Sequence, residues 1–434
     1  MDVKITKPIK GGTIRAIASK SEAHRLLICA ALANTETFLY CPERSEDIDA
    51  TKRCLTAMGA TIENFVDGFQ INPGKIREMI LNRCTDAHNE KHIKLNCGES
   101  GATLRFLLPV CGALGLPVSF LMAGRLPSRP LTGLYEEMTA HGCNISGHGS
   151  TLLSCEGQLK SGIYNIPGNI SSQFISGLLL ALPILLGDST INVTGVLESR
   201  PYVDITLDTL HSFGININEK EKNTFDIPGG QIFRSPGKIN VGGDWSNAAF
   251  WLSAGAIGHG SITCTGLDPN SKQGDKLITG FLESFGANVS YANNSVTVSP
   301  GDLQGIEIDA GDTPDLVPVL AAIASVAKGT TIIRNASRLR IKESDRLHTV
   351  TVTLSALGAD IKETNDGLII TGRPKLSGGE VKSFGDHRIA MTAAVISAVC
   401  TGDVIIEGAE AVRKSYPGFF EDFKNVLGGD WKEI

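Results

Sequence analysis

Phe213-Gly214-Ile215-Asn216-Ile217, Phe285-Gly286-Ala287-Asn288-Val289 and Leu357-Gly358-Ala359-Asp360-Ile361 are three copies of one short pattern. In each copy an apolar residue ends a helix-like stretch, a glycine follows, and polar and apolar residues then alternate. Glycine fits the left-handed turn that stops a helix, and the alternation after it is typical of a half-buried strand. The pattern therefore predicts a helix, a turn and a short strand.

The pattern occurs six times along the chain. The glycines that mark it are Gly59, Gly142, Gly214, Gly286, Gly358 and Gly428. Successive glycines from Gly142 to Gly358 are separated by equal intervals of 72 residues, and the sixth copy, Leu427-Gly428-Gly429-Asp430-Trp431, is degenerate. A supersecondary unit repeated at a fixed period indicates a repeat architecture. Because 434 residues are too many for one core, six units favour two domains of three units each.

A segment rich in turn-forming residues separates the third unit from the fourth. It extends from Asp226 to Gly237 and includes the run Pro228-Gly229-Gly230. Such clusters mark boundaries between elements. The N-terminal strand Val3-Lys4-Ile5 precedes the first unit, and the last unit is short at its C-terminal end. We therefore expect one domain over residues 20–240 and a second formed by residues 1–19 plus 241–434.

Composition predicts a globular chain and excludes several classes of partner. Hydrophobic residues make up 42% of the chain and charged residues 20%. The aromatic content of 6%, the formal charge of −6 and the absence of a Lys/Arg run argue against nucleic acid as a partner. The ten cysteines form no CxxC pair, which favours reduced thiols over a zinc site. We expect a cytoplasmic protein, because no stretch is apolar and long enough for a signal peptide or a membrane span.

Several expected helices begin with residues suited to holding anions. These starts are Lys20-Ser21, Glu99-Ser100-Gly101, Ser171-Ser172-Gln173, Asp312-Thr313-Pro314-Asp315, Lys342-Glu343-Ser344-Asp345 and Asp386-His387-Arg388. Free N–H groups and the helix dipole attract phosphate and carboxylate there. Ser, Thr and Asp are also ordinary N-caps, so capping alone is an alternative at each start. Lys20, Lys342 and Arg388 would oppose the dipole, which favours a bound anion near them.

Cations also gather outside the helix starts. Arg125 and Arg129 lie in a loop stiffened by proline, and the run Arg338–Lys342 is expected to be extended and to alternate three cations. Isolated charges of this kind are usually solvated surface groups. The mixture of acids and bases in Lys342-Glu343-Ser344-Asp345-Arg346 instead favours a site that binds anions and also moves a proton.

Read together, these segments resemble the 5-enolpyruvylshikimate-3-phosphate synthase (3-phosphoshikimate 1-carboxyvinyltransferase) family of enolpyruvyl transferases. The resemblance runs from Lys20 to Lys414, and its most specific segments are Lys20-Ser21 with Arg25, Leu126-Pro127-Ser128-Arg129-Pro130, Ser171-Ser172-Gln173, Arg200-Pro201-Tyr202, Pro314-Asp315, Lys342-Glu343-Ser344-Asp345-Arg346 and Asp386-His387-Arg388. It implies the α/β class and a two-domain inside-out α/β barrel-like fold. Each domain would contain three of six βαβαββ-type units, and the active site would lie in a cleft that closes around substrates.

The resemblance also assigns residues to two substrates and to catalysis. It implies that shikimate 3-phosphate is bound by Ser21, Arg25, Ser171, Ser172, Ser199, Tyr202, Asp315 and Lys342. It implies that phosphoenolpyruvate is bound by Lys20, Gly101, Arg129, Gln173, Arg346, Arg388 and Lys414. Asp315 would act on the substrate hydroxyl, and Glu343, assisted by Lys20, on the methylene carbon. Which of Lys20 and Asp315 takes the hydroxyl proton stays open.

The implied reaction moves the enolpyruvyl group of phosphoenolpyruvate to the 5-hydroxyl of shikimate 3-phosphate by addition and elimination. It belongs to the shikimate pathway, which leads to chorismate and the aromatic amino acids. No metal or organic cofactor is expected, because arginines and lysines would stabilise the developing charge. We expect a monomer that acts on these small molecules, with neither nucleic acid nor a membrane as a partner.

The chain departs from the family at two positions, and two other functions compete. Many members have Asn-x-Gly-Thr where this chain has Glu99-Ser100-Gly101-Ala102, and some have asparagine in place of Arg338. One alternative is the sister transferase that acts on UDP-N-acetylglucosamine, which typically has Lys-Asn in place of Lys20-Ser21. The other is a non-catalytic anion-binding repeat protein. That protein would be expected to lack the acid–base residues, and these are present here.

Overall fold

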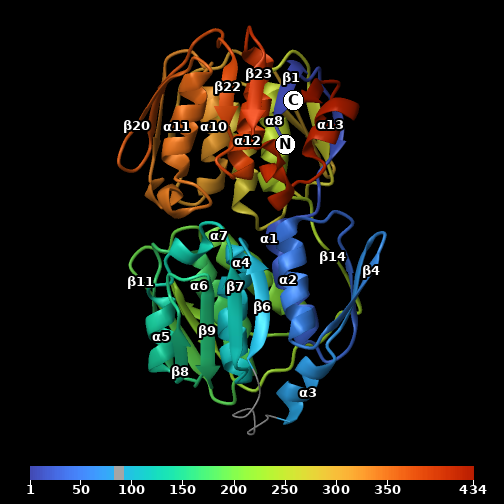
Figure 1. The fold of residues 1–434 in the computed structure, drawn as a ribbon, viewed down its shortest axis with the longest axis vertical. Helices are drawn as coiled ribbons and strands as arrows, with labels where there is room; N and C mark the ends of the chain where they lie inside the picture. The colour runs from blue at the N-terminus through green and yellow to red at the C-terminus, as the bar shows by residue number, and fades with distance from the viewer. Residues whose placement is uncertain (83–91) are drawn as a thin grey trace. The chain divides into compact units, whose positions relative to one another are not determined.

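The computed structural model describes residues 1–82 and 92–434. Contacts within the chain divide it into two compact units. We call Lys20–Val241 the contiguous unit, and Met1–Ser19 together with Gly242–Ile434 the split unit. In Figure 1 the contiguous unit runs from blue through green, and the split unit combines dark blue with yellow to red. Each unit is described by itself.

Each unit contains three four-stranded sheets within the described residues, and all six sheets share one plan. The first pair of strands is parallel, as between β6 and β7, and the next two pairs are antiparallel, as between β7 and β9 and between β9 and β8. This repetition confirms the α/β class and the six-unit architecture expected from the glycines.

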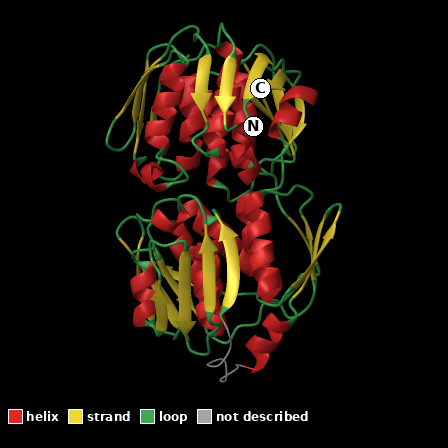
Figure 2. Cartoon of the chain, viewed as in Figure 1, coloured by secondary structure: helices red, strands yellow, loops and turns green. Residues whose placement is uncertain are grey.

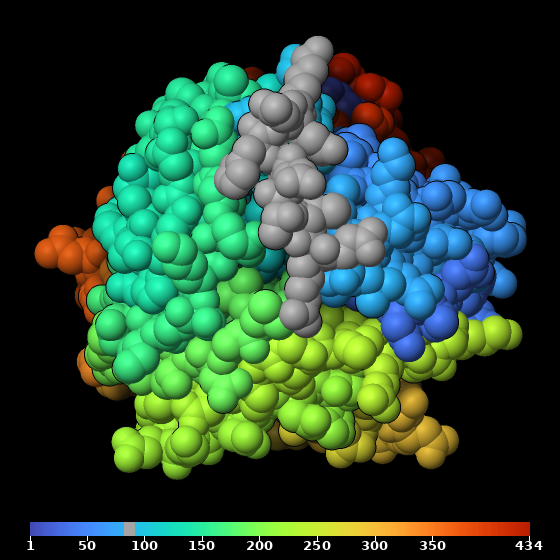
Figure 3. Space-filling view, turned by 90° about the horizontal axis from the view of Figure 1, so that it is seen from below, coloured from blue at the N-terminus to red at the C-terminus, as the bar shows by residue number. Residues whose placement is uncertain are grey.

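All strands of the three sheets of the contiguous unit come from residues of that unit. Their strands are β3 (Thr37–Tyr40), β4 (Thr61–Phe65), β5 (Gly68–Asn72), β6 (Ile93–Gly98), β7 (Val118–Met122), β8 (Cys143–Ser146), β9 (Leu152–Gly157), β10 (Ile163–Pro167), β11 (Ser189–Thr194), β12 (Asn218–Glu221), β13 (Thr224–Ile227) and β14 (Lys238–Asn240). The last strand, β14, pairs with β3 from the start of the unit. In Figure 3 the yellow segment that leads to β14 lies against the blue segment around β3, in agreement with the bond from Ser235 Oγ to Glu36 O.

Two sheets of the split unit need strands from the N-terminus. The strands of this unit are β1 (Val3–Lys7), β2 (Gly12–Arg15), β15 (Ile262–Thr265), β16 (Asn288–Ala292), β17 (Ser295–Ser299), β18 (Glu307–Asp309), β19 (Thr330–Arg334), β20 (Asp360–Glu363), β21 (Leu368–Thr371), β22 (Gly379–Lys382), β23 (Val404–Glu407) and β24 (Asp430–Glu433). Strand β2 pairs with β15, and β1 lies between β23 and β24. The chain leaves this unit and returns to it at neighbouring positions, since Ser19 N donates to Gly242 O at 2.8 Å.

Buried helices form the interior of each unit, and the sheets lie outside them (Figure 2). The first helix of each repeat is the more buried one: α1 (Lys20–Leu32), α4 (Gly101–Leu114), α6 (Ser172–Ala181), α8 (Trp245–Ile257), α10 (Val317–Ala324) and α12 (His387–Ile396). The other helices are α2 (Glu46–Ala57), α3 (Lys75–Asn82), α5 (Leu134–Ala140), α7 (Arg200–Ser212), α9 (Ile278–Phe285), α11 (Arg346–Ala356) and α13 (Phe419–Asn425). In the split unit α8, α10 and α12 all pack against one another. This arrangement agrees with the inside-out fold.

All six marker glycines have positive φ, between 70° and 109°, which explains why glycine is needed where the helix stops. Five of the following strands begin one or two residues later. In the third repeat the strand begins only at Asn218, so the expectation of a strand over residues 215–217 is wrong. There the Gln231 side chain bonds both the N–H and the C=O of Asn216, at 2.8 and 3.0 Å, in place of a strand neighbour.

Two further properties bear on the class of protein. The nine cysteines that lie in the described ranges are free thiols, eight of them buried, and Cys84 lies outside these ranges. Within residues 1–82 and 92–434, no helix combines the length and the apolar character that a membrane span requires.

Candidate active site

The residues expected to bind anions in the contiguous unit lie at the N-terminal ends of four helices. Lys20 and Ser21 begin α1, Gly101 begins α4, Ser172 and Gln173 begin α6, and Tyr202 lies in the first turn of α7. Ser100 and Ser171 cap α4 and α6 by accepting from the N–H groups of Thr103 and Gln173. Capping is therefore confirmed at these two starts. Anion binding there stays a prediction.

Arg25 joins three of these helices. Its Nε donates to Thr206 Oγ1 at 2.7 Å, and its Nη1 and Nη2 donate to the carbonyls of Ser21 and Tyr202 at 2.6 and 2.9 Å. Nη2 also donates to Ser176 Oγ at 3.3 Å. Burial lowers the pKa of this guanidinium to about 10. Arg25 thus fixes the starts of α1 and α7 to α6, and its contact with substrate stays a prediction.

Lys20 has a carboxylate partner that the sequence analysis did not identify. Its Nζ lies 2.8 Å from Asp47 Oδ2, on the second residue of α2. An acidic residue in the first turn of a helix is common, so the sequence offered no signal that Asp47 reaches Lys20. The pair orients the ammonium group at the start of α1, where the anion site was expected.

Gly101 allows two arginines to approach the start of α4. A Cβ added at Gly101 would lie 2.9 Å from Arg129 Nη1 and 3.0 Å from Arg105 Nη1. Arg105 Nη1 also donates to Gln173 Oε1 at 2.9 Å. The structure therefore brings Gly101, Arg129 and Gln173 together, and it adds Arg105, which the sequence analysis missed because this arginine lies inside an apolar helix.

Ser199 has a backbone conformation that is rare outside glycine. Its φ of 55° places it in the left-handed region directly before α7. Non-glycine residues in this region are often found at functional sites, where the surroundings hold them in place. Its position supports the predicted role in binding.

Arg346 is the centre of the candidate site in the split unit. It begins α11, and its guanidinium contacts three carboxylates. Its Nε lies 2.8 Å from Asp386 Oδ2, its Nη1 2.8 Å from Asp315 Oδ1 and its Nη2 2.7 Å from Glu343 Oε2. Burial alone would lower the pKa of Arg346, but these carboxylates raise it above its usual value. The guanidinium therefore stays charged and fixes the three acids relative to one another.

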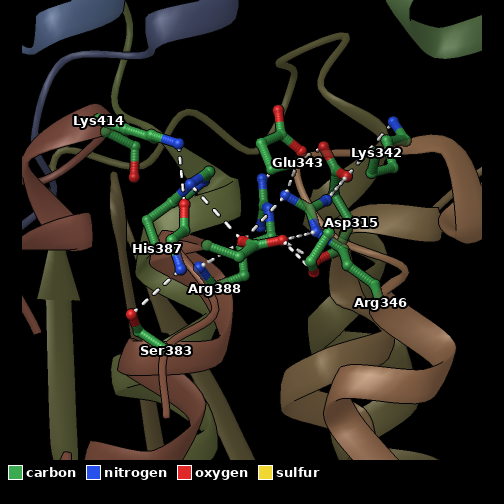
Figure 4. Close-up of polar contacts among 12 residues, drawn as sticks. Asp315, Lys342, Glu343, Arg346, Ser383, His387, Arg388 and Lys414 are labelled. Atoms are coloured by element: carbon green, nitrogen blue, oxygen red, sulfur yellow. Dashed lines mark hydrogen bonds and ion pairs between the residues drawn. The ribbon is translucent and has the colours of Figure 1, made fainter. Parts of the chain in front are cut away.

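Asp315 lies between cations. Arg388 Nη2 is 3.2 Å from its Oδ2, and Lys342 Nζ is 3.6 Å from its Oδ1. Burial favours the neutral acid, but Arg388, Lys342 and Arg346 together hold the pKa of this carboxyl well below its usual range. Burial in turn lowers the pKa of Lys342 to about 8. Figure 4 shows Lys342 and Glu343 on one side of the cluster and Lys414 beside His387 on the other.

Lys414 lies at the end of a short 3₁₀ helix, Ala409–Lys414, and its Nζ donates to Gly385 O at 2.8 Å. Gly385 belongs to the loop before α12, where Phe384 has a φ of 55°. Lys414 is therefore held beside the start of α12. The roles given to Asp315, Lys342, Glu343, Arg346, Arg388 and Lys414 stay predictions, although the first five lie in one connected cluster.

Two details correct the sequence analysis. The run Ser337–Ile341 is a 3₁₀ helix and not an extended approach. From it, Arg340 donates to the carbonyls of Thr364 and Asn365, and Arg338 donates to Gly311 O. In addition, the cations expected to need a bound anion already have protein carboxylates close by. Asp47 faces Lys20, and Asp315 faces both Lys342 and Arg388.

Asp386 has a larger role than the helix start that the sequence predicted. Its Oδ1 caps α12 by accepting from Arg388 N at 3.0 Å, and its Oδ2 accepts from Arg346 Nε and from Ser344 Oγ. It is fully buried. The sequence signal for capping was correct, but it did not indicate that the same carboxylate would hold Arg346 from another repeat.

Comparison with known proteins places this geometry in a family. A sequence profile described as EPSP synthase (3-phosphoshikimate 1-carboxyvinyltransferase) matches residues 3–423. The 3-phosphoshikimate 1-carboxyvinyltransferase of Clostridium kluyveri is 43% identical, over 97% of this chain and 96% of that protein. The enzyme of the same name from Clostridioides difficile is also 43% identical, over 98% of this chain and 97% of that protein.

Solved structures agree with the sequence comparison. The EPSP synthase of Acinetobacter baumannii has a TM-score of 0.79 and 26% identity, with full coverage of both chains. The enolpyruvyl transferase NikO of Streptomyces tendae has a TM-score of 0.77 and covers 100% of this chain and 98% of that one; at 18% identity it supports the fold alone.

The six-sheet fold with helices inside is that of the enolpyruvyl transferases. Within this class, the match of the profile over nearly the whole chain and the identity to curated relatives are specific. The chain belongs to the EPSP synthase (3-phosphoshikimate 1-carboxyvinyltransferase) family.

Proposed function

We propose that this chain transfers the enolpyruvyl group of phosphoenolpyruvate to the 5-hydroxyl of shikimate 3-phosphate and releases phosphate. The observation that carries this proposal is the pair of carboxylates, Asp315 and Glu343, that share the Arg346 guanidinium among further cations. Addition and elimination require an acid and a base that exchange roles between the two steps. Family membership supplies the identity of the substrates.

The cations of both units would bind the anionic groups of the two substrates. Each substrate carries a phosphate and a carboxylate, so four anionic groups must be held near one another. Ser21, Arg25, Ser171, Ser172, Ser199, Tyr202, Asp315 and Lys342 are assigned to shikimate 3-phosphate. Lys20, Gly101, Arg129, Gln173, Arg346, Arg388 and Lys414 are assigned to phosphoenolpyruvate. Forked arginine donors suit phosphate and carboxylate, and helix starts provide additional N–H groups.

Asp315 would take the proton of the attacking hydroxyl as the oxygen bonds to the central carbon of phosphoenolpyruvate. Glu343, assisted by Lys20, would deliver a proton to the methylene carbon and would take one back when phosphate leaves. The pKa of Asp315 is held low by Arg388, Lys342 and Arg346. Substrate anions would compete for these cations, so binding would raise the pKa of Asp315 and make it a stronger base.

We assign the enzyme to the cytoplasm and expect it to act as a monomer. Substrates that carry both a phosphate and a carboxylate do not cross a bilayer unaided, so they are retained in the compartment where they are made. Sedimentation equilibrium with both substrates present tests the oligomeric state, and a mass of two chains would contradict the monomer.

The experiment that tests the function measures phosphate release from phosphoenolpyruvate in metal-free buffer. It is run alone, with shikimate 3-phosphate, and with UDP-N-acetylglucosamine. Release that depends on shikimate 3-phosphate is the expected result. Release only with the nucleotide sugar would move the chain to the sister transferase, and no release with either substrate would favour an anion-binding protein without catalytic activity.

The role of Asp315 can be tested by Asp315→Ala, with Asp315→Asn as the variant that keeps its shape. If Asp315 is the base, both variants should bind substrates but lose turnover by roughly 10²–10⁴-fold. Asp302→Asn is the control, because Asp302 is an exposed carboxylate of the same unit that pairs with Lys328. Near-normal turnover in both Asp315 variants would remove this residue from the mechanism.

A further inference from the structure

Asp275 is a buried carboxylate outside every set of residues considered so far. It lies in the 3₁₀ helix Gly274–Leu277 of the fourth repeat, from which no candidate site residue comes. The residue is only 3% exposed. Its Oδ1 is buried and has no hydrogen-bond partner among residues 1–82 and 92–434. A buried carboxylate that is only half satisfied costs free energy, so its presence calls for an explanation.

The other oxygen of Asp275 connects it to the candidate active site. Oδ2 accepts a hydrogen bond from Ser246 Oγ, in the first turn of α8. Ser246 Oγ in turn accepts from Arg388 Nη2 at 2.7 Å. A serine hydroxyl has one proton and two lone pairs, so Ser246 can donate to Asp275 while it accepts from Arg388. The contacts form a chain from Asp275 through Ser246 to Arg388.

Arg388 is held by two opposing partners. Its Nη2 contacts Ser246 Oγ at 2.7 Å and Asp315 Oδ2 at 3.2 Å, and its Nη1 donates to Asp315 O at 3.0 Å. Without the Ser246 contact, the attraction of Asp315 for the guanidinium would meet less opposition. A shift towards Asp315 would remove the arginine from its substrate and would further neutralise the candidate base.

Asp275 is not the main residue that holds its own loop in place. The neighbouring Gln273 does this, because its Oε1 accepts from Trp245 N at 3.0 Å and its Nε2 donates to Gly243 O at 2.8 Å. These bonds fix the loop to the start of α8 through backbone groups. The loop therefore does not depend on the Asp275 carboxylate alone.

We propose that Asp275 is a positioning residue for phosphoenolpyruvate: through the Ser246 hydroxyl it holds the Arg388 guanidinium away from Asp315 and in place for the substrate. The inference rests on the proposed assignment of Arg388 to phosphoenolpyruvate. It adds Ser246 and Asp275, both of the fourth repeat, to the residues that serve the reaction, and it gives neither of them a contact with a reacting atom.

The charge of Asp275 makes this effect depend on pH. Burial raises the pKa of Asp275 to about 6, the charge of Asp315 acts in the same direction, and Arg388 opposes it. Asp244, at the N-cap of α8, also raises it. Above pH 6 the charged carboxylate accepts firmly from Ser246. Below pH 6 the protonated group is a weaker acceptor for the Ser246 proton, and the hold on Arg388 weakens.

The test compares Ser246→Ala, Asp275→Asn and the double variant. We expect each single variant to raise the KM for phosphoenolpyruvate about tenfold, the usual effect of losing one hydrogen bond to a charged group. The Kd for shikimate 3-phosphate should stay unchanged. The double variant should be no worse than Ser246→Ala, because Asp275 acts through Ser246. Ser246→Thr keeps the hydroxyl and should restore most of the affinity.

Asp268→Asn is the matched control, because Asp268 lies in the same loop but is exposed. Among the described residues, its carboxylate accepts a hydrogen bond from Asn270 N and none from Ser246. Melting temperatures of all variants separate a loss of folding from a loss of positioning. An unchanged KM for phosphoenolpyruvate in Ser246→Ala and Asp275→Asn would overturn the inference, and so would equal losses for the two substrates.

The pH profile provides a second, independent readout. The ratio of the phosphoenolpyruvate KM of Asp275→Asn to that of the wild type removes the titration of the substrate itself. This ratio should fall towards one as the pH is lowered from 7.5 to 5, and a constant ratio would contradict the inference.

The variant Arg388→Lys distinguishes the proposed binding role of Arg388 from the proposed positioning role of Asp275. If it leaves the KM for phosphoenolpyruvate unchanged, the proposed role of Arg388 fails; if it raises this KM while the Ser246 and Asp275 variants do not, only the positioning role fails.

Discussion

Lys342 has an ammonium group that titrates close to neutral pH. Burial is the main reason that its pKa is lowered to about 8, and Arg346 adds to this effect while Asp315 opposes it. A doubly charged anion beside Lys342 would favour the protonated form. We therefore predict that binding of shikimate 3-phosphate at pH 8.5 takes up part of a proton, and that Lys342→Met removes this uptake.

Isothermal titration calorimetry in two buffers of different ionisation enthalpy measures the uptake directly. Lys328→Met serves as the control, because Lys328 is an exposed lysine of the same unit that pairs with Asp302. The same uptake in Lys342→Met as in the wild type would exclude Lys342 as the group that titrates.

The sequence indicated which single residues carry charge at the candidate site, but not how they pair. Arg346 was identified from the resemblance. Its three carboxylates come from positions 315, 343 and 386, and only Glu343 is near it in the chain. Pairing between distant segments depends on tertiary packing, which local pattern does not encode. For the same reason the helix-dipole argument overlooked Asp47 as the partner of Lys20.

The start of α4 depends on the absence of a side chain at Gly101. A Cβ there would lie 2.9 Å from Arg129 Nη1, so the end of a flexible side chain would have to move. We predict that Gly101→Ala displaces Arg129 and raises the KM for phosphoenolpyruvate about tenfold or more, with little loss of stability. Steady-state kinetics and thermal melting check the two parts of this prediction.

Gly112→Ala is the matched control in the same helix. A Cβ at Gly112 would lie 2.9 Å from Cys143 Sγ and 3.2 Å from Met138 Cε, inside the core. This variant should lower the melting temperature and leave the KM for phosphoenolpyruvate unchanged, the reverse of Gly101→Ala. If both variants change only stability, the start of α4 does not take part in binding.

Helix starts were more predictable than helix ends. Ser100, Ser171, Asp345 and Asp386 were each identified near a start, and each caps its helix with its side chain. By contrast, the sequence analysis gave no end for α6, which stops at Ala181, where the chain tightens into a 3₁₀ turn that contains Pro183. Caps are local, so sequence reveals them; an end depends on what the helix packs against.

The two units differ in which parts of the chain they need in order to fold. The three sheets of the contiguous unit come from one continuous stretch of chain, whereas the split unit takes β1 and β2 from residues 1–19 and its other strands from residues 242–434. We predict that residues 20–241 alone fold cooperatively and that residues 242–434 alone do not. Residues 1–19 joined directly to 242–434 should fold, because Ser19 N and Gly242 O are 2.8 Å apart.

Circular dichroism and urea unfolding of the three fragments test this prediction. Cooperative unfolding of the 242–434 fragment by itself would show that β1 and β2 are dispensable. An unfolded 20–241 fragment would instead show that the contiguous unit needs the rest of the chain.

The repeat architecture was predictable because one local unit recurs, and each recurrence repeats the same turn. The glycine pattern predicted six units, and six sheets are found in the part of the chain that the structure describes. The pairing of the N-terminal strands β1 and β2 with strands from the C-terminal part of the chain was only partly predicted. Residues 1–19 were expected to join the second domain, but nothing local to β1 shows that it lies between β23 and β24. The expected position of the substrates between the two domains stays a prediction.

The long separation in sequence between β1 and its partner strands has a consequence while the chain is being synthesised on the ribosome. Strand β1 is made first, yet its partners β23 and β24 begin only at Val404 and Asp430. At about 5–20 residues per second, β1 waits roughly 20–80 s for them. An unpaired strand can recruit a neighbouring chain, and lysines discourage such pairing. Lys4 and Lys7 within β1 can therefore protect the nascent chain from aggregation while the rest of the polypeptide is translated.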